Sequence, residues 1–256
     1  TIRRPPRFAL FPYTTLFRSG LEMMDTLAIR AAEDFVHAGY PSDACAILLC
    51  ELDGTSVEVT DQIASVEQIL TSSGATEIRT SANEEERQLF WKGRKAAFPS
   101  VGRISPDYYC MDGTIPRKAL ASILGQISQL SVDYDLPVAN VFHAGDGNLH
   151  PLILYDANIE GELERTEEFG GKILELCVLA GGAITGEHGV GKEKIDQMCV
   201  QFKSLEVQIF HDIKHSFDPQ ELLNPGKAVP TLHRCAELGG MHVHDGLLSH
   251  PGLERF

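Results

Sequence analysis

The chain has 256 residues, a formal net charge of -14, 43% hydrophobic residues and 23% charged residues. This length allows one large domain or two small ones, and the acidic balance excludes a nucleic-acid surface, which needs clustered lysine and arginine. No apolar run approaches the roughly 20 residues of a membrane-spanning helix. We therefore expect a soluble protein without a transmembrane segment.

Residues 1–19 differ in composition from the rest of the chain. The first 20 residues, TIRRPPRFALFPYTTLFRSG, carry four arginines and no acidic residue. Such a composition is typical of a transit peptide, but the proline-rich start and the absence of an amphipathic period disfavour one. The segment also resembles translated adaptor sequence, which is the interpretation we favour, and we leave it out of the expected fold.

Hydrophobic periodicity predicts alternating helices and strands from residue 20 onward. The run ACAILLCELDG is typical of a strand buried on both faces, and Pro116 stands where a helix would begin. In chain order we expect a helix over 21–39, a strand over 44–54, a helix over 60–73, a short strand near Glu77, a helix over 83–97, a strand within 106–116 and a helix from 116 to about 134.

This alternation predicts an α+β fold with helices on one face of a sheet, for which ferredoxin-like is the nearest simple description. We expect three segments: a leader over 1–19, a folded domain over 20–226 with a mostly helical end, and a tail over 227–256 packed on the body. A histidine cluster in the tail is expected to serve packing, not a second metal site; it comprises His242, His244 and His250.

The stretch VANVFHAGDGNLHPLILYD predicts a β-hairpin, because Asp-Gly between two apolar runs is a strong turn signal. With Asp146 and Gly147 as the turn, His143 lies directly opposite His150. Opposed side chains on antiparallel strands are about 5 Å apart at Cβ, so two imidazoles can converge on one metal ion. The alternative is that both histidines are ordinary polar strand residues.

The segment AGGAITGEHGVGKEK offers a third ligand, Glu187, at the end of a short apolar strand. Its neighbour His188 cannot easily point the same way, which suits a division of labour between metal ligand and proton acceptor. The same segment also satisfies the phosphate-loop pattern G-x-x-x-x-G-K. Glu193 replaces the Ser or Thr that should bind Mg²⁺, so we disfavour a nucleotide site.

A basic island, FWKGRKAAFPSVGR, interrupts the acidic chain. An arginine such as Arg94 can hold a substrate carboxylate with two parallel hydrogen bonds, although a solvated helix face is the simpler interpretation. Asn224, before Pro225, is either functional or the last residue of a helix. The six cysteines form no CxxC pair, which suggests neither a zinc knuckle nor a disulfide framework and favours a reducing, cytoplasmic compartment.

Four blocks, FPSVGRISPDYYCMDGTIPR, FHAGDGNLHP, AITGEHGVGKEK and FDPQELLNPGK, occur together and in this order. With them, residues 20 to 256 resemble the C-terminal part of the FAD-linked oxidase family, in particular its glycolate oxidase flavoprotein type. The chain is also similar to D-lactate and D-2-hydroxyglutarate dehydrogenases. The resemblance implies a cap or substrate domain whose FAD-binding partner domain precedes it in the family and is missing here.

The resemblance also implies roles for individual residues. His143, His150 and Glu187 match ligands of a divalent metal, for which Zn²⁺, Mn²⁺ or Fe²⁺ would suit. His188 matches a general base, Arg94 a substrate-carboxylate contact and Asn224 a residue near the flavin. Cys110 stands where some relatives use a lysine for substrate, which favours a small substrate over a dicarboxylate.

The implied function is oxidation of a D-2-hydroxy acid, such as glycolate or D-lactate, to the 2-oxo acid with FAD as hydride acceptor. The resemblance further implies flavin and iron-sulfur partner subunits, with the protein cytoplasmic and peripheral to the inner membrane. The alternative is a catalytically inactive, truncated metal-binding or interaction module. Flavin absorbance of the purified protein discriminates between the two.

Overall fold

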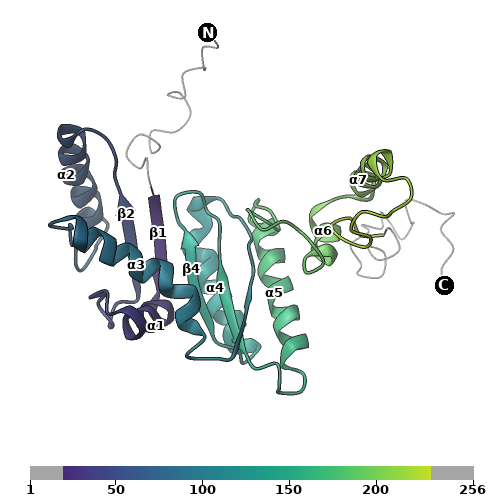
Figure 1. The fold of residues 1–256 in the computed structure, drawn as a ribbon, viewed down its shortest axis with the longest axis horizontal. Helices are drawn as coiled ribbons and strands as arrows, with labels where there is room; N and C mark the ends of the chain where they lie inside the picture. Colours follow the sequence, from purple (N-terminus) through teal and green to yellow (C-terminus); the bar gives the residue numbers. More distant parts are fainter. Residues whose placement is uncertain (1–19, 232–256) are drawn as a thin grey trace, which may run out of the picture. The chain divides into compact units, whose positions relative to one another are not determined.

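The structure, a computed structural model, describes residues 20–231 (Figure 1). Within this range, no helix combines the length and apolarity that crossing a membrane requires. The strands are β1 (Gly20–Asp25), β2 (Ala46–Glu51), β3 (Asp107–Cys110), β4 (Val138–His143) and β5 (Pro151–Tyr155). The helices are α1 (Thr26–Val36), α2 (Ser56–Ser72), α3 (Glu84–Val101), α4 (Leu120–Asp133), α5 (Glu162–Leu179), α6 (Ile195–Gln201) and α7 (Ser204–Phe217), with a 3-10 turn at Arg117–Ala119 before α4.

The strands form one sheet in the order β2-β1-β4-β5-β3. The pairs β1 with β2, β1 with β4, and β4 with β5 are antiparallel, and Figure 1 shows β1 between β2 and β4. The expected α+β architecture is therefore confirmed. The chain divides into two compact units: in the described range, unit 1 comprises residues 20–108 and 137–158, and unit 2 comprises residues 109–136 and 159–231.

The first element of unit 1 is a strand, so the prediction that a helix begins at residue 21 is wrong. The helix α1 begins five residues later, at Thr26. Residues 20–25 pair with β2 and residues 22–24 also pair with β4, and Glu22 and Met24 are buried at the two-residue spacing of a strand face. Asp25 ends the strand and caps α1, because its carboxylate accepts the backbone N–H of Ala28. The same carboxylate accepts two hydrogen bonds from Asn140 of β4, which ties the helix start to the sheet.

Burial raises the pKa of Asp25 above its ordinary value, against the opposing effect of its hydrogen bonds. The helix that it caps turns a small apolar face inward, comprising Ala28, Ile29, Ala31 and Ala32. This face packs against α3, which Asn83 caps and which runs four residues beyond the expected end. The Tyr40 hydroxyl donates to the Phe90 carbonyl of α3 and fixes the loop after α1 to that helix.

Two expectations about unit 1 are wrong. We expected a strand buried on both faces over 44–54, but β2 lies at an edge of the sheet and its Leu48 is 43% exposed. No strand forms near Glu77: residues 75–83 are irregular. Arg79 there donates to the Gly39 carbonyl and stacks its guanidinium over Phe90, so side chains and not a β ladder hold this segment.

The core of unit 2 lies between α4 and α5. The helix α4 is the one expected after Pro116, and α5 is the next helix along the chain. Tyr134 stacks on Phe169 with ring centroids 5.3 Å apart, and Ile127 and Ile173 are fully buried. After α5, Thr114 and Ala183 exchange both of their backbone hydrogen bonds. This bridge fastens the segment that leads to Glu187 onto the segment that follows β3.

Gly182 makes that bridge possible, and its replacement by alanine is expected to destabilise unit 2. An added Cβ would lie 1.8 Å from the Thr114 carbonyl oxygen, which is backbone and cannot rotate away. Overpacking of this kind costs about 1–3 kcal/mol, or several degrees in melting temperature. The matched control is Gly125→Ala in α4, where nothing lies within 4 Å and alanine should stabilise the helix by about 0.5–1 kcal/mol. Equal melting temperatures for the two variants would contradict this account.

Candidate functional site

The hairpin of β4 and β5 forms as expected, but its register differs from the expected one by two residues. His143 bridges Asn148, not His150, and the Val141 N–H donates to the His150 carbonyl. The connection is the four residues 144–147, with Gly147 at φ +85°, because Gly145 donates its N–H to Leu21 of β1 and is drawn out of a two-residue turn. A shift of two residues keeps every side chain on its face of the sheet.

The two histidines are therefore diagonal neighbours on one face, and their rings still meet. Their ring centroids are 5.2 Å apart at an interplanar angle of 83°. His150 is 3% exposed and contacts Phe98 edge to face, whereas the His143 side chain is 36% exposed. Aromatic side chains reach across such a diagonal, so the pairing needed for two imidazole ligands survives the change of register.

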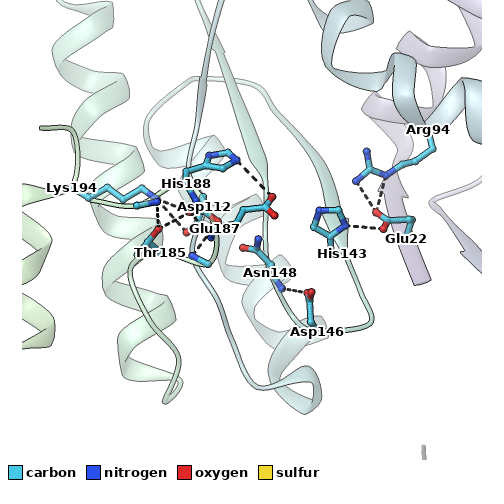
Figure 2. A network of polar contacts seen from close by, with 12 residues as sticks. Glu22, Arg94, Asp112, His143, Asp146, Asn148, Thr185, Glu187, His188 and Lys194 are labelled. Carbon is cyan, nitrogen blue, oxygen red and sulfur yellow. Dashed lines mark hydrogen bonds and ion pairs between the residues drawn. The ribbon is translucent and has the colours of Figure 1, made fainter. Parts of the chain in front are cut away.

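Glu22 connects His143 to Arg94 (Figure 2). One carboxylate oxygen lies 2.7 Å from Nδ1 of His143, and the other accepts Nε and Nη2 of Arg94 at 3.1 and 2.7 Å. Arg94 is 7% exposed, so the solvated-face alternative is wrong for this arginine, although Lys92 and Lys95 beside it are exposed. The substrate contact expected of Arg94 stays a prediction.

In unit 2, the carboxylate of Asp112 organises the segment that carries Glu187 and His188. It accepts the backbone N–H groups of residues 186, 187 and 188 and the hydroxyl of Thr185 (Figure 2). Lys194 adds an ion pair to Asp112 at 3.1 Å. This one carboxylate thus fixes the backbone on which the expected ligand and the expected base stand.

Asp112 is 0% exposed and Lys194 is 2% exposed. Burial by itself would raise the pKa of Asp112, but hydrogen bonds from Thr185, His188 and Lys194 outweigh it and hold the pKa well below its ordinary value. The arrangement also explains why the G-x-x-x-x-G-K pattern is misleading. The N–H groups that would cradle a phosphate already bind a carboxylate of the chain, which supports the expectation against a nucleotide site.

Glu187 and His188 both lie on the surface of unit 2, with side chains about half exposed. His188 Nε2 is 3.7 Å from a Glu187 carboxylate oxygen, so the two side chains approach each other instead of diverging. The short strand expected before Glu187 is a single bridge at Ala183, since the backbone turns away at once to reach Asp112.

Asn224 is not the last residue of a helix, because α7 ends at Phe217. It has a left-handed φ of +47° and accepts a hydrogen bond from Lys227. Asn148, opposite His143, is 5% exposed, and its side-chain oxygen has no hydrogen-bond partner within the described residues.

Sequence reasoning missed Glu22, Asp112 and Lys194. Glu22 had a signal, since it is the one acidic side chain in the apolar run LEMM, but the run was taken for a helix. Asp112 begins the DGTIP block, which the resemblance already singled out. Lys194 carried no signal, because only tertiary structure distinguishes it from Lys192.

Residues 15–228 match the family described as FAD linked oxidases, C-terminal domain, and the chain belongs to this family. It shares its fold with p-cresol methylhydroxylase with substrate bound, at a TM-score of 0.64 and 14% identity over 86% of this chain and 48% of that one.

Two curated relatives are similar in sequence. Glycolate oxidase subunit GlcD of Escherichia coli K12 is 67% identical over 93% of this chain and 48% of its own length. The probable mitochondrial D-lactate dehydrogenase of Danio rerio is 28% identical over 82% of this chain and 42% of its own length. The chain thus spans about half the length of the curated relatives that it matches.

Proposed function

We propose that the protein oxidises a D-2-hydroxy acid of the size of glycolate or D-lactate to the 2-oxo acid. The observation that carries the proposal is the pair of imidazoles on one hairpin face, with His143 backed by the Glu22 carboxylate. Names of relatives support the substrate class, since they include a glycolate oxidase subunit and a D-lactate dehydrogenase. Within this proposal, residues 20–226 form the substrate and metal domain.

The residues present fit a divalent metal. Glu22 accepts at Nδ1 of His143, which is how a carboxylate commonly sets the ring of a ligating histidine. We propose His143, His150 and Glu187 as the ligands. Two imidazoles and one carboxylate suit Zn²⁺, Mn²⁺ or Fe²⁺. Bound metal would act as a Lewis acid that lowers the pKa of the substrate hydroxyl.

The other residues then have distinct tasks. His188 accepts the hydroxyl proton as the carbonyl forms at C2 of the substrate, and Arg94 orients the substrate carboxylate. Asp112 holds His188 in place through its backbone N–H. Bound FAD would supply the acceptor for the hydride that leaves C2, and we propose Asn224 as a residue near it. Flavin and iron-sulfur partner subunits belong to the same proposal.

Replacing Glu187 by glutamine is expected to lower bound metal and turnover together, each by about tenfold or more, because a neutral carboxamide is a poor ligand for a divalent cation. Metal content by plasma mass spectrometry and oxidation of glycolate and D-lactate by the flavin-loaded protein provide the two measurements. Glu193→Gln is the matched control, since Glu193 is an exposed glutamate of the same segment. Unchanged metal content in Glu187→Gln would remove Glu187 from the site. A purified protein without flavin absorbance would favour the inactive-module alternative.

A further inference from the structure

Glu22 is a buried carboxylate that serves two groups at once. Its side chain is 10% exposed, one oxygen faces Nδ1 of His143 at 2.7 Å, and the other receives both Nε and Nη2 of Arg94. A buried carboxylate destabilises the folded state unless hydrogen bonds and an opposite charge compensate it, so Glu22 needs both of its partners. No expectation from the sequence assigned it a role.

The sheet fixes where Glu22 stands. Glu22 and His143 are direct cross-strand partners in the antiparallel pair of β1 and β4, so their side chains share one face. Arg94 comes from α3 and closes the group from a third element. Figure 2 shows the Glu22 carboxylate between the imidazole and the guanidinium.

We propose that Glu22 is a positioning residue that sets the metal-binding nitrogen of His143 and the orientation of Arg94 together. This inference rests on the proposed function. The carboxylate oxygen at 2.7 Å favours the ring form of His143 that carries its hydrogen on Nδ1 and presents the Nε2 lone pair to a metal. On Arg94, Nε and Nη2 are committed to Glu22, and Nη1 makes no hydrogen bond within the described residues. The substrate carboxylate would therefore meet Arg94 through Nη1.

Glutamine at position 22 cannot do both tasks, although it has nearly the same shape. Both neighbours are donors, and a carboxamide offers one oxygen and one NH₂ group. If its oxygen turns to Arg94, the NH₂ group meets Nδ1 of His143. The hydrogen of the imidazole then moves to Nε2, which removes the lone pair from the nitrogen that would bind metal.

The test is the affinity for Zn²⁺ alone, measured on the purified protein by competition with a chromophoric chelator. We expect Glu22→Gln to weaken Zn²⁺ binding by roughly 10–100-fold, the usual effect of removing a carboxylate behind a ligating histidine. The matched control is Glu51→Gln. Glu51 also stands on a strand of this sheet and also accepts from an arginine of α3, Arg87, at 3.0 Å. The cross-strand partner of Glu51 is Gly20, not a histidine, so Glu51→Gln should bind Zn²⁺ within about twofold of the unsubstituted protein.

A double variant separates positioning from folding. In Glu22→Gln with Arg94→Met, the competing guanidinium is gone, so the carboxamide oxygen is released to accept from His143 Nδ1 and Zn²⁺ affinity should recover most of its loss. A merely structural role for Glu22 predicts the opposite, because the second substitution removes a further buried contact. Thermal melting of all variants reports folding separately.

The outcomes distinguish this inference from the function on which it rests. Loss in Glu22→Gln with recovery in the double variant supports it. Zn²⁺ affinity in Glu22→Gln equal to that of Glu51→Gln, or no recovery in the double variant, overturns the role of Glu22 and leaves the proposed function standing. An unsubstituted protein that binds neither Zn²⁺ nor Mn²⁺ overturns both.

Discussion

Replacing Asp112 by asparagine is expected to lower the free energy of unfolding by about 3–5 kcal/mol, the usual cost of breaking a buried ion pair on one side. Without the Asp112 carboxylate, the Lys194 ammonium loses its counter-charge, although the Lys194 residue is only 2% exposed. It also weakens the acceptor shared by three backbone N–H groups and Thr185. Denaturant unfolding followed by circular dichroism measures the change.

Asp218→Asn is the matched control for Asp112→Asn. Asp218 likewise accepts from a lysine, Lys214, and from two backbone N–H groups, but its lysine reaches solvent. Its substitution should therefore cost much less. Adding Lys194→Met to Asp112→Asn removes the stranded ammonium and should recover part of the loss. An Asp112→Asn protein within about 1 kcal/mol of the unsubstituted one would refute the argument.

The effect of Asp112→Asn should also depend on pH. Because the folded state holds the pKa of Asp112 below its ordinary value of about 3.9, Asp112 contributes its full stability above that value. The contribution is lost as the pH falls from about 4 toward the folded-state pKa. The difference in melting temperature between the two proteins should thus be smaller at pH 3 than at pH 7.

Local sequence signals were sufficient where one element decides the structure. The proline at 116 and the Asp-Gly signal each act within a few residues of chain, and the helix after Pro116 and the hairpin of β4 and β5 are confirmed, although the connection of the hairpin is two residues longer than expected. The helix predicted for the run LEMM was wrong for a different reason. Its apolar spacing suits a helix or a strand equally, and pairing with β2 and β4, both distant in sequence, decides for the strand.

The candidate site shows the same division. The two histidines were found from the hairpin that holds them, and the error of two residues in register came from Gly145, whose partner Leu21 is remote in the chain. Glu22 stands out locally only as an acidic residue in an apolar run, and Lys194 does not stand out at all, so the roles of both appear only in their tertiary contacts. A sequence of this kind identifies the groups that would touch a ligand more readily than the buried charges that hold those groups in place.

His188→Gln is expected to slow the oxidation of glycolate or D-lactate by about 10²–10⁴-fold, the usual contribution of a positioned general base, while metal content stays unchanged. Glutamine retains hydrogen-bonding capacity but cannot take up a proton. The Asp112 contact to residue 188 is made by the backbone N–H, so the substitution leaves the local backbone anchored. Steady-state turnover and the rate at which substrate bleaches the flavin absorbance measure the loss.

Metal content and turnover, compared between Glu187→Gln and His188→Gln, distinguish a ligand from a base. Glu187→Gln should lose metal and rate together, whereas His188→Gln should lose rate alone, even though the two side chains are adjacent in sequence and 3.7 Å apart. His215→Gln, an exposed histidine of α7, provides the control and should match the unsubstituted protein in both measurements. Loss of metal in His188→Gln would make His188 a ligand and leave the proton acceptor to be sought elsewhere. Retention of full turnover would exclude it as the base, because no other group of the proposal accepts the hydroxyl proton.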